Sequence, residues 1–202
     1  EPNLALTATG TLLMGTFDGL LTSSDHGCGW ASAAPSLARS VTGMAVDAKN
    51  PSRVVVLLSE GVTGGTFASE LWQSLDGGAT FQGLGASLDP STLFLSVGIS
   101  ASEPARLYLS GLPGAGGGKS VVFRSADSGQ SWQSTALAGT PGAAAYVAGV
   151  HPSNPDVVYV RANFTGSASS EGALWASNDG AKSFSEVLKK AAPLMGFAAR
   201  IS

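Results

Sequence analysis

The sequence predicts an all-β protein made of four repeated units, each a four-stranded antiparallel sheet. An eight-residue motif occurs four times, and its aspartates stand 51, 51 and 52 residues apart. A short stretch of alternating apolar and polar residues leads into each copy, as in a strand that enters a turn. A proline recurs in the second, third and fourth units, at positions 51, 104 and 155. A repeat of this length indicates stacked units that bury one continuous core.

The motif reads Ser-x-Asp-x-Gly-x-x-Trp or Phe and predicts a tight corner between two strands; we call it the corner motif. Serine and aspartate side chains accept hydrogen bonds from backbone N–H groups a few residues on, which closes a turn. The glycine permits a positive φ, and we expect the aromatic residue to open the next strand and face an apolar layer. The corner residues are Ser23, Asp25, Gly27 and Trp30; Ser74, Asp76, Gly78 and Phe81; Ser125, Asp127, Gly129 and Trp132; and Ser177, Asp179 and Phe184, with Ala181 in the place of the glycine.

These residues resemble the Asp box, or BNR repeat, of sialidases, sortilin-type receptors, xyloglucan-degrading glycosidases and photosystem II assembly factors. The resemblance covers the whole chain, with one box in each repeat. It implies a β-propeller of four-stranded antiparallel blades, in which the box joins the third and fourth strands and lies away from the active site. Because one fold hosts many unrelated activities, the resemblance specifies the architecture and not the function.

The four blades are expected at about 1–35, 36–88, 89–140 and 141–190, with the start of another at 191–202. In the first blade the sequence predicts strands over 4–8, 11–16 and 20–23, and Trp30 opens a fourth. In the second blade strands cover 41–47 and 53–58. The run Val54–Leu58 is apolar throughout, as in a strand that is covered on both faces. A loop rich in glycine and threonine is expected over 59–70, before a strand at 71–74.

The third and fourth blades repeat this plan. Strands are expected at 93–99, 106–110 and 121–125, with a loop over 111–120, and then at 146–150, 157–161 and 174–177, with a loop over 162–172. The prolines stand in turns before each second strand, where a missing N–H group costs nothing. The segment 186–192 reads as one helical turn, and 195–199 resembles the first strand of a fifth repeat.

Four blades and one further strand form either a closed ring or part of a larger propeller. An open arc would expose apolar strand faces at both of its ends, including Leu12, Leu20, Val187 and Leu188. Such faces tend to pair. We therefore expect self-association or blades missing from this chain.

The amino-acid composition limits the classes of partner that the protein can have. Only 12% of the 202 residues are charged, and the net charge is −3 with no basic stripe, so no nucleic-acid partner is expected. The longest aliphatic run, Val54–Leu58, is far too short to insert into a membrane. The chain begins Glu1-Pro2, as expected of a mature or trimmed product, and has a single cysteine, Cys28. We expect an exported protein that is secreted, periplasmic or attached to the cell envelope.

Strand direction separates two ends of the disc. The corner motifs and the proline turns belong to one end, and the loops over 59–70, 111–120 and 162–172 belong to the other, which is the expected binding face. The charged residues predicted on this binding face are Glu60, Glu70, Lys119, Arg161 and Glu171.

No catalytic residue, metal ligand or cofactor site is assigned from the sequence. A sialidase resemblance requires a cluster of arginines, and only Arg39, Arg161 and Arg200 could reach the loop face. A xyloglucanase-like reaction requires two carboxylates across a cleft, available only from Asp18 and the three glutamates above. We therefore favour a non-catalytic propeller that binds a protein or carbohydrate ligand. The alternative is a sialidase- or xyloglucanase-like glycoside hydrolase whose active site lies partly outside this chain.

Overall fold

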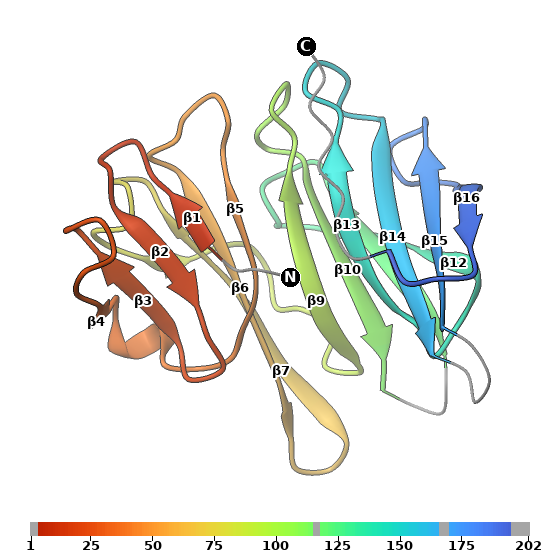
Figure 1. Ribbon diagram of the computed structural model, residues 1–202, viewed down its shortest axis with the longest axis horizontal. Helices are drawn as coiled ribbons and strands as arrows, with labels where there is room; N and C mark the ends of the chain where they lie inside the picture. The colour runs from red at the N-terminus through yellow and green to blue at the C-terminus, as the bar shows by residue number, and fades with distance from the viewer. Residues whose placement is uncertain (1–3, 115–117, 166–169, 195–202) are drawn as a thin grey trace.

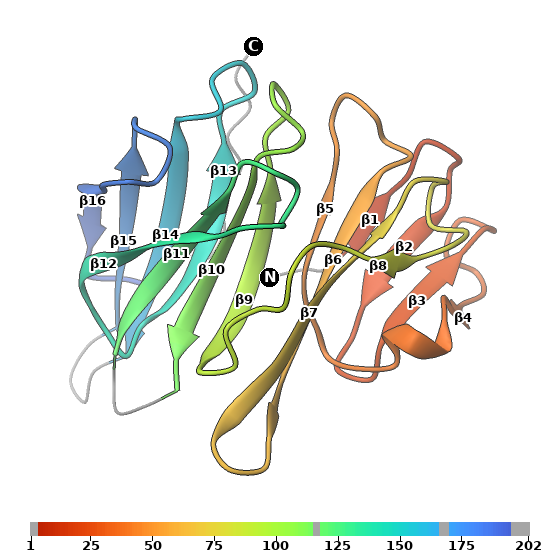
Figure 2. The same ribbon diagram turned by 180° about the vertical axis from the view of Figure 1, so that it is seen from behind.

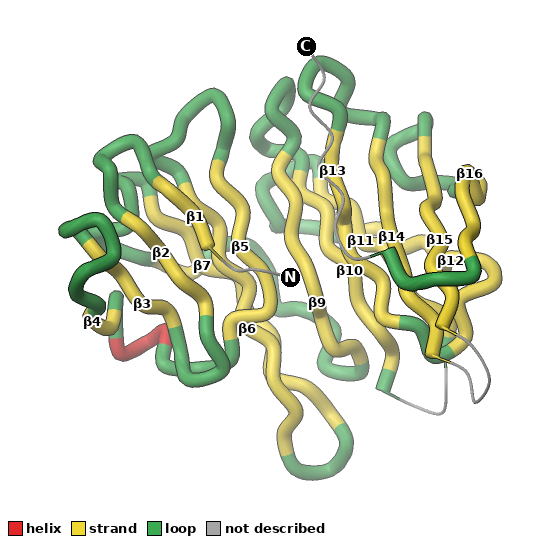
Figure 3. The backbone as a smooth tube through the Cα atoms, in the orientation of Figure 1, coloured by secondary structure: helices red, strands yellow, loops and turns green. Residues whose placement is uncertain are grey.

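The computed structural model, which describes residues 4–114, 118–165 and 170–194, contains four separate four-stranded antiparallel sheets. Each sheet is a simple meander of four consecutive strands (Figure 1). The one helix among the described residues is a short 3-10 turn, Pro35–Leu37, shown in red in Figure 3. The strands are β1 (Leu4–Leu6), β2 (Leu12–Gly15), β3 (Leu20–Ser23), β4 (Ala31–Ser32), β5 (Val41–Val46), β6 (Val54–Val62), β7 (Thr66–Ser74), β8 (Gln82–Gly83), β9 (Thr92–Ile99), β10 (Leu107–Pro113), β11 (Lys119–Ser125), β12 (Gln133–Pro141), β13 (Ala144–Val150), β14 (Val158–Thr165), β15 (Ser170–Ser177) and β16 (Ser185–Lys190).

The sheets stack face to face in chain order and form an open arc. Strand β5 contacts β1 on one side and β9 on the other, and β13 contacts β9 and β10. The first and fourth sheets lie at opposite ends of the arc in both views (Figures 1 and 2). This arrangement is a partial propeller, in agreement with the predicted all-β, four-bladed architecture.

In the described part of the chain, the apolar core consists of three layers, one between each pair of neighbouring sheets. Strand β6 contributes to two of them: Val54, Val56 and Leu58 face the first sheet, whereas Val55 and Leu57 face the third. All five side chains are fully buried. The apolar run predicted to be covered on both faces therefore has a core layer on each side.

The predicted exposure of apolar end faces is correct in part. Leu20 was expected at an open end, but it is buried in the layer between the first and second sheets. Val187 and Leu188 of β16 are exposed, as are Leu4 and Leu6 of β1.

The loops expected at 59–70, 111–120 and 162–172 were placed wrongly, because most of these residues are strand. Strands β6 and β7 pair continuously from Val54 and Ser74 to Val62 and Thr66, so only residues 63–65 form the turn. Likewise β14 extends to Thr165 and β15 begins at Ser170. Glycine, serine and threonine conceal this pairing in the sequence, because a ladder of backbone hydrogen bonds needs no apolar alternation.

The helical turn expected over 186–192 is also wrong, because residues 185–190 form β16, which pairs with β15. All six of its side chains are exposed, which explains the weak strand signal. The strand expected at 195–199 lies outside the described residues.

The four corner motifs share three hydrogen bonds, and a fourth, from a Ser or Thr hydroxyl, is lacking in the first motif, where Gly29 stands in that position. In the third motif the Ser125 hydroxyl donates to Oδ1 of Asp127 over 2.7 Å, and the Gly129 N–H donates back to Ser125 Oγ over 2.7 Å. The Ser131 N–H donates to Oδ1 of Asp127 over 2.9 Å, and the Ser131 hydroxyl donates to Oδ2. The serine–aspartate bond recurs at 2.7, 2.7 and 2.8 Å in the first, second and fourth motifs.

Two successive residues of each corner have a positive φ. Residues Ser128 and Gly129 have φ values of 57° and 85°. The non-glycine residues with positive φ among the described residues all lie in corner motifs: His26, Ser128 and Ala181. The glycine of the motif therefore supplies the conformation that the sequence predicted, and Ala181 adopts the same conformation at a steric cost.

The aromatic residue of each corner precedes the fourth strand by one position and does not open it. Phe81, Trp132 and Phe184 are partly buried and pack against the core layers, as expected. Trp30 was expected to do the same, but it is exposed and its Nε1 donates to the Gly27 carbonyl. The first sheet lies at the end of the arc, and β4 has only two residues.

The proline turns connect neighbouring sheets. The carbonyl oxygen of each turn proline accepts a hydrogen bond from the preceding sheet. The donors are the Ala8 N–H to Pro51 (3.2 Å), Arg53 Nη1 to Pro104 (2.7 Å) and the Tyr108 hydroxyl to Pro155 (2.6 Å).

The corner hydrogen bonds lower the pKa values of the motif aspartates. The hydroxyl of Ser131, with help from Ser125, lowers the pKa of Asp127 to about 2. The hydroxyl and N–H of Thr80 lower the pKa of Asp76 to about 2. Because the unfolded value is about 3.9, the folded state gains stability above that pH and loses it as the pH falls toward 2.

We therefore predict that the urea midpoint of the wild type falls steeply between about pH 4 and pH 2. The triple variant Asp76→Asn, Asp127→Asn and Asp179→Asn should unfold at lower urea at neutral pH, and its midpoint should fall less across that window than the midpoint of the wild type. Asp18→Asn, in the exposed β2–β3 turn, should keep the wild-type pH profile. If the wild type and the triple variant have the same pH profile, the corner aspartates are not the cause of the loss of stability at low pH.

Ser128→Gly should raise the free energy of unfolding by about 0.5–1 kcal/mol. Relief of the left-handed conformation outweighs the extra chain entropy that glycine loses on folding. The Ser128 N–H would still donate to the Ala105 carbonyl. The adjacent Gly129→Ala is the opposite control: φ is +85° and the new Cβ would lie 3.3 Å from Trp132, so stability should fall. Denaturant titration measures the free energy of unfolding of both variants. A lower value for Ser128→Gly than for the wild type would contradict the claim that the left-handed conformation of Ser128 costs stability.

Candidate binding site

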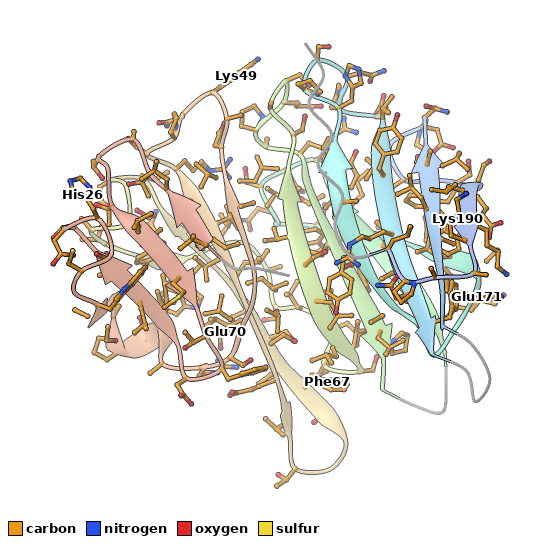
Figure 4. All side chains as sticks on the ribbon, in the orientation of Figure 1. His26, Lys49, Phe67, Glu70, Glu171 and Lys190 are labelled. Atoms are coloured by element: carbon orange, nitrogen blue, oxygen red, sulfur yellow. The ribbon has the colours of Figure 1, made fainter. Side chains whose placement is uncertain are left out.

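The two ends of the disc carry different features. In three sheets a corner N–H donates to the turn between the first and second strands: Gly77 to Ser52, Ser128 to Ala105 and Gly180 to Asp156. Figure 4 shows His26 and Lys49 toward this corner end and Phe67 and Glu70 toward the other, which we call the loop end. The tip of the β6–β7 hairpin projects beyond the rest of the loop end (Figures 1 and 2).

A cluster of charged side chains lies on the loop end where the first and second sheets meet. Arg39, in the link between β4 and β5, donates from Nε to Oε1 of Glu60 over 2.9 Å and from Nη1 to Oε1 of Glu70 over 3.0 Å. Its Nη2 donates to the Ala68 carbonyl over 3.0 Å. The other carboxylate oxygen of Glu70 accepts from Trp72 Nε1 over 3.0 Å. We call these four side chains, of Arg39, Glu60, Glu70 and Trp72, the arginine cluster.

The strand register builds this cluster. Glu60 lies opposite Ala68, and Glu70 lies opposite Leu58, so both carboxylates project from one face of the β6–β7 hairpin. Trp72 follows Glu70 by two residues and shares that face. Partial burial disfavours the charged guanidinium, but the hydrogen bonds to the two glutamates outweigh it and raise the pKa of Arg39. The cluster is a fixed feature that carries one net negative charge.

The other predicted residues lie elsewhere. Lys119 is exposed at the start of β11. Glu171 pairs with Lys189 over 3.1 Å on the fourth sheet, far from Glu70 in Figure 4. Arg161 stands in the middle of β14, where it is 6% exposed and its guanidinium lies 4.8 Å from the centre of the Tyr146 ring. Its Nη1 donates to the Leu194 carbonyl over 3.1 Å.

Of the five residues predicted on the binding face, the structure therefore brings together only Glu60 and Glu70. The sequence reasoning retained Arg39 as a candidate but did not assign Trp72. Glu70 and Trp72 are two positions apart in β7, and in a strand this spacing indicates that both side chains lie on the same face. Arg200, another arginine considered for the loop end, lies outside the described residues.

Two hollows flank the link between β8 and β9. The first has a volume of about 430 Å³ and lies against β7, between residues 67–72 and 83–88. The second, of about 490 Å³, is mainly apolar; Leu88, Phe94, Phe123 and Trp132 line it, together with Asp89. Ser87 and Leu88 line both hollows and thus separate them.

Within the described residues, no group of three or more His, Cys, Asp or Glu side chains is arranged to hold a metal ion. No helix in the same part of the chain is long and apolar enough to cross a membrane.

The Sortilin-Vps10 sequence family, described as sortilin, neurotensin receptor 3, matches residues 69–199, which is more than half of the chain. The chain belongs to this family. No curated protein matches the chain. The matched region of this Sortilin-Vps10 protein includes the β7 half of the arginine cluster and three of the four corner motifs.

Solved structures show the same fold. A GH74 xyloglucanase from Xanthomonas campestris is 21% identical with a TM-score of 0.64, and the match covers 93% of this chain and 30% of the enzyme. The NanB sialidase of Streptococcus pneumoniae is 12% identical with a TM-score of 0.56, over 91% of this chain and 29% of the sialidase. YCF48 bound to D1 peptide is 15% identical with a TM-score of 0.50, over 89% and 50% of the two chains. The chain thus spans less than a third of the xyloglucanase that it resembles.

Proposed function

We propose that this Sortilin-Vps10 protein is a non-catalytic, exported binding module that holds a protein ligand at its loop end. The observation that carries the proposal is the arginine cluster. One guanidinium engages the carboxylates of both Glu60 and Glu70, at 2.9 and 3.0 Å. A glycoside hydrolase needs its two carboxyl groups on opposite sides of a bound sugar, free to act on it. Side chains tied to one arginine suit a fixed recognition surface better.

Charge and shape favour a polypeptide ligand. The cluster carries one net negative charge and lies beside a hollow whose wall is a strand, so a basic segment of polypeptide would be attracted to it. The family description names a neurotensin receptor, and one structural neighbour was solved with a bound peptide. Carbohydrate is the second ligand class, because a xyloglucanase and a sialidase share the fold.

An array of random-sequence peptides, probed with the labelled chain, tests the proposal. We expect the wild type to retain a set of basic peptides. The double variant Glu60→Gln, Glu70→Gln should bind these peptides about tenfold more weakly, which corresponds to about 1.4 kcal/mol of binding free energy. Asp127→Asn, at the corner end, is the matched control and should bind like the wild type at a temperature where it is folded.

The same preparation is incubated with xyloglucan oligosaccharides and chromogenic sialosides. The proposal expects no turnover. Hydrolysis that is lost in Glu70→Gln would contradict it and favour the glycoside hydrolase. If the chain binds a glycan array and retains no peptide, the ligand class is carbohydrate and the proposal of a protein ligand is wrong.

A further inference from the structure

The outer edge of β7 is incompletely covered. In the third and fourth sheets the outer strand follows its neighbour along almost its whole length, as the pairs Lys119 with Pro141 and Gly172 with Lys190 show. In the second sheet β8 has only two residues, and these pair with Trp72 and Gln73. The remainder of β7, from Thr66 to Leu71, has no outer strand among the residues that the structure describes.

Two hydrogen bonds define which residues face outward. The Leu84 N–H donates to the Leu71 carbonyl over 2.8 Å, and the Phe67 N–H donates to the Pro90 carbonyl over 2.8 Å. Backbone groups alternate in direction along a strand, so Ser69, midway between them, also faces outward. Between the two bonds the link bonds to the third corner motif, because the Ala86 N–H donates to the Gly129 carbonyl over 2.8 Å. Within the described part of the chain, no backbone bond joins Ser69 to this link.

The hollow of about 430 Å³ lies between β7 and this link. Its wall presents the N–H and C=O groups of Ser69 and the N–H group of Leu71. A strand edge of alternating donors and acceptors is complemented by another extended backbone. Beyond Leu88 lies the second hollow, of about 490 Å³, which is large and apolar enough for a bulky side chain.

We propose that an extended segment of the protein ligand adds to the sheet at this edge, pairing its backbone with Ser69. One of its apolar side chains enters the hollow formed by Leu88, Phe94, Phe123 and Trp132, and a basic residue faces Glu70. The inference rests on the proposed function and gives it a place and a ligand chemistry. The acidic balance of the arginine cluster, together with Asp89 at the second hollow, selects basic over acidic segments.

The test uses an acetylated, amidated peptide of alternating valine and lysine, titrated into the full chain and followed by calorimetry. A second version carries N-methyl groups on alternate residues, which removes the N–H donors of one edge and leaves the side chains unchanged. A third version has glutamate in place of lysine. We expect the first peptide to bind and each of the other two to bind at least about tenfold more weakly.

A variant of Ser69 probes the same contact from the protein. Ser69→Pro removes the outward N–H group, which the ladder with β6 does not use, and proline is tolerated at such an edge. This variant should bind the valine–lysine peptide at least about tenfold more weakly than the wild type does. Ser24→Ala is the control, because Ser24 is exposed in the first corner motif at the opposite end of the disc, and this variant should bind like the wild type. Circular dichroism establishes that both variants are folded, and if Ser69→Pro is not, the N-methylated peptide decides the question.

Equal binding of the methylated and unmethylated peptides would overturn the edge site, even if the chain is a peptide receptor. The edge site would also be overturned if the chain binds peptides on the array but does not bind the valine–lysine peptide. Retention of no peptide on the array would instead refute the proposed function itself.

Discussion

The structure depends on the hydrogen bond between a serine hydroxyl and an aspartate carboxylate in each corner. That bond holds the serine oxygen where the N–H two residues beyond the aspartate can reach it, as Gly129 reaches Ser125 over 2.7 Å. Ser128 is the first of the two left-handed residues, and its N–H donates to the first turn of the same sheet. The turn proline then accepts a bond from the preceding sheet. Local corner chemistry is thus connected to the stacking of whole sheets.

Among the described residues, no such repeated set of hydrogen bonds occurs at the opposite end of the disc, and there the sheets differ from one another. The second sheet has the longest inner hairpin and one of the shortest outer strands. The hairpin positions Glu60 and Glu70 for Arg39, and the short outer strand leaves the edge at Ser69 without a strand partner. The proposed binding surface therefore lies where the second blade combines a long inner hairpin with a short outer strand, and the corners supply the rigid support.

The corners, the turns and the order of the strands could be predicted because their chemistry is local: a serine, an aspartate and a glycine at fixed spacing close a turn in any context. The extent of the hairpins could not, because the pairing of residues 59–62 with 66–69 depends on the facing backbone and not on side-chain pattern. Arg39 joins residues that are 21 and 31 positions away, so only the folded chain shows that the two glutamates share one partner. Trp30 was expected in a core layer, but the first sheet lies at the end of the arc.

Hydrogen exchange of the corner amides tests this account most directly. The N–H groups of Gly78, Gly129 and Ala181 are buried and donate to serine oxygens. They should exchange as slowly as the amides inside β6 and β10, and Ser125→Ala should remove the protection of Gly129 while leaving Gly78 and Ala181 protected. Exchange of these amides in the wild type at the rate of Gly64, in the β6–β7 turn, would show that the corners are not what fixes the sheets.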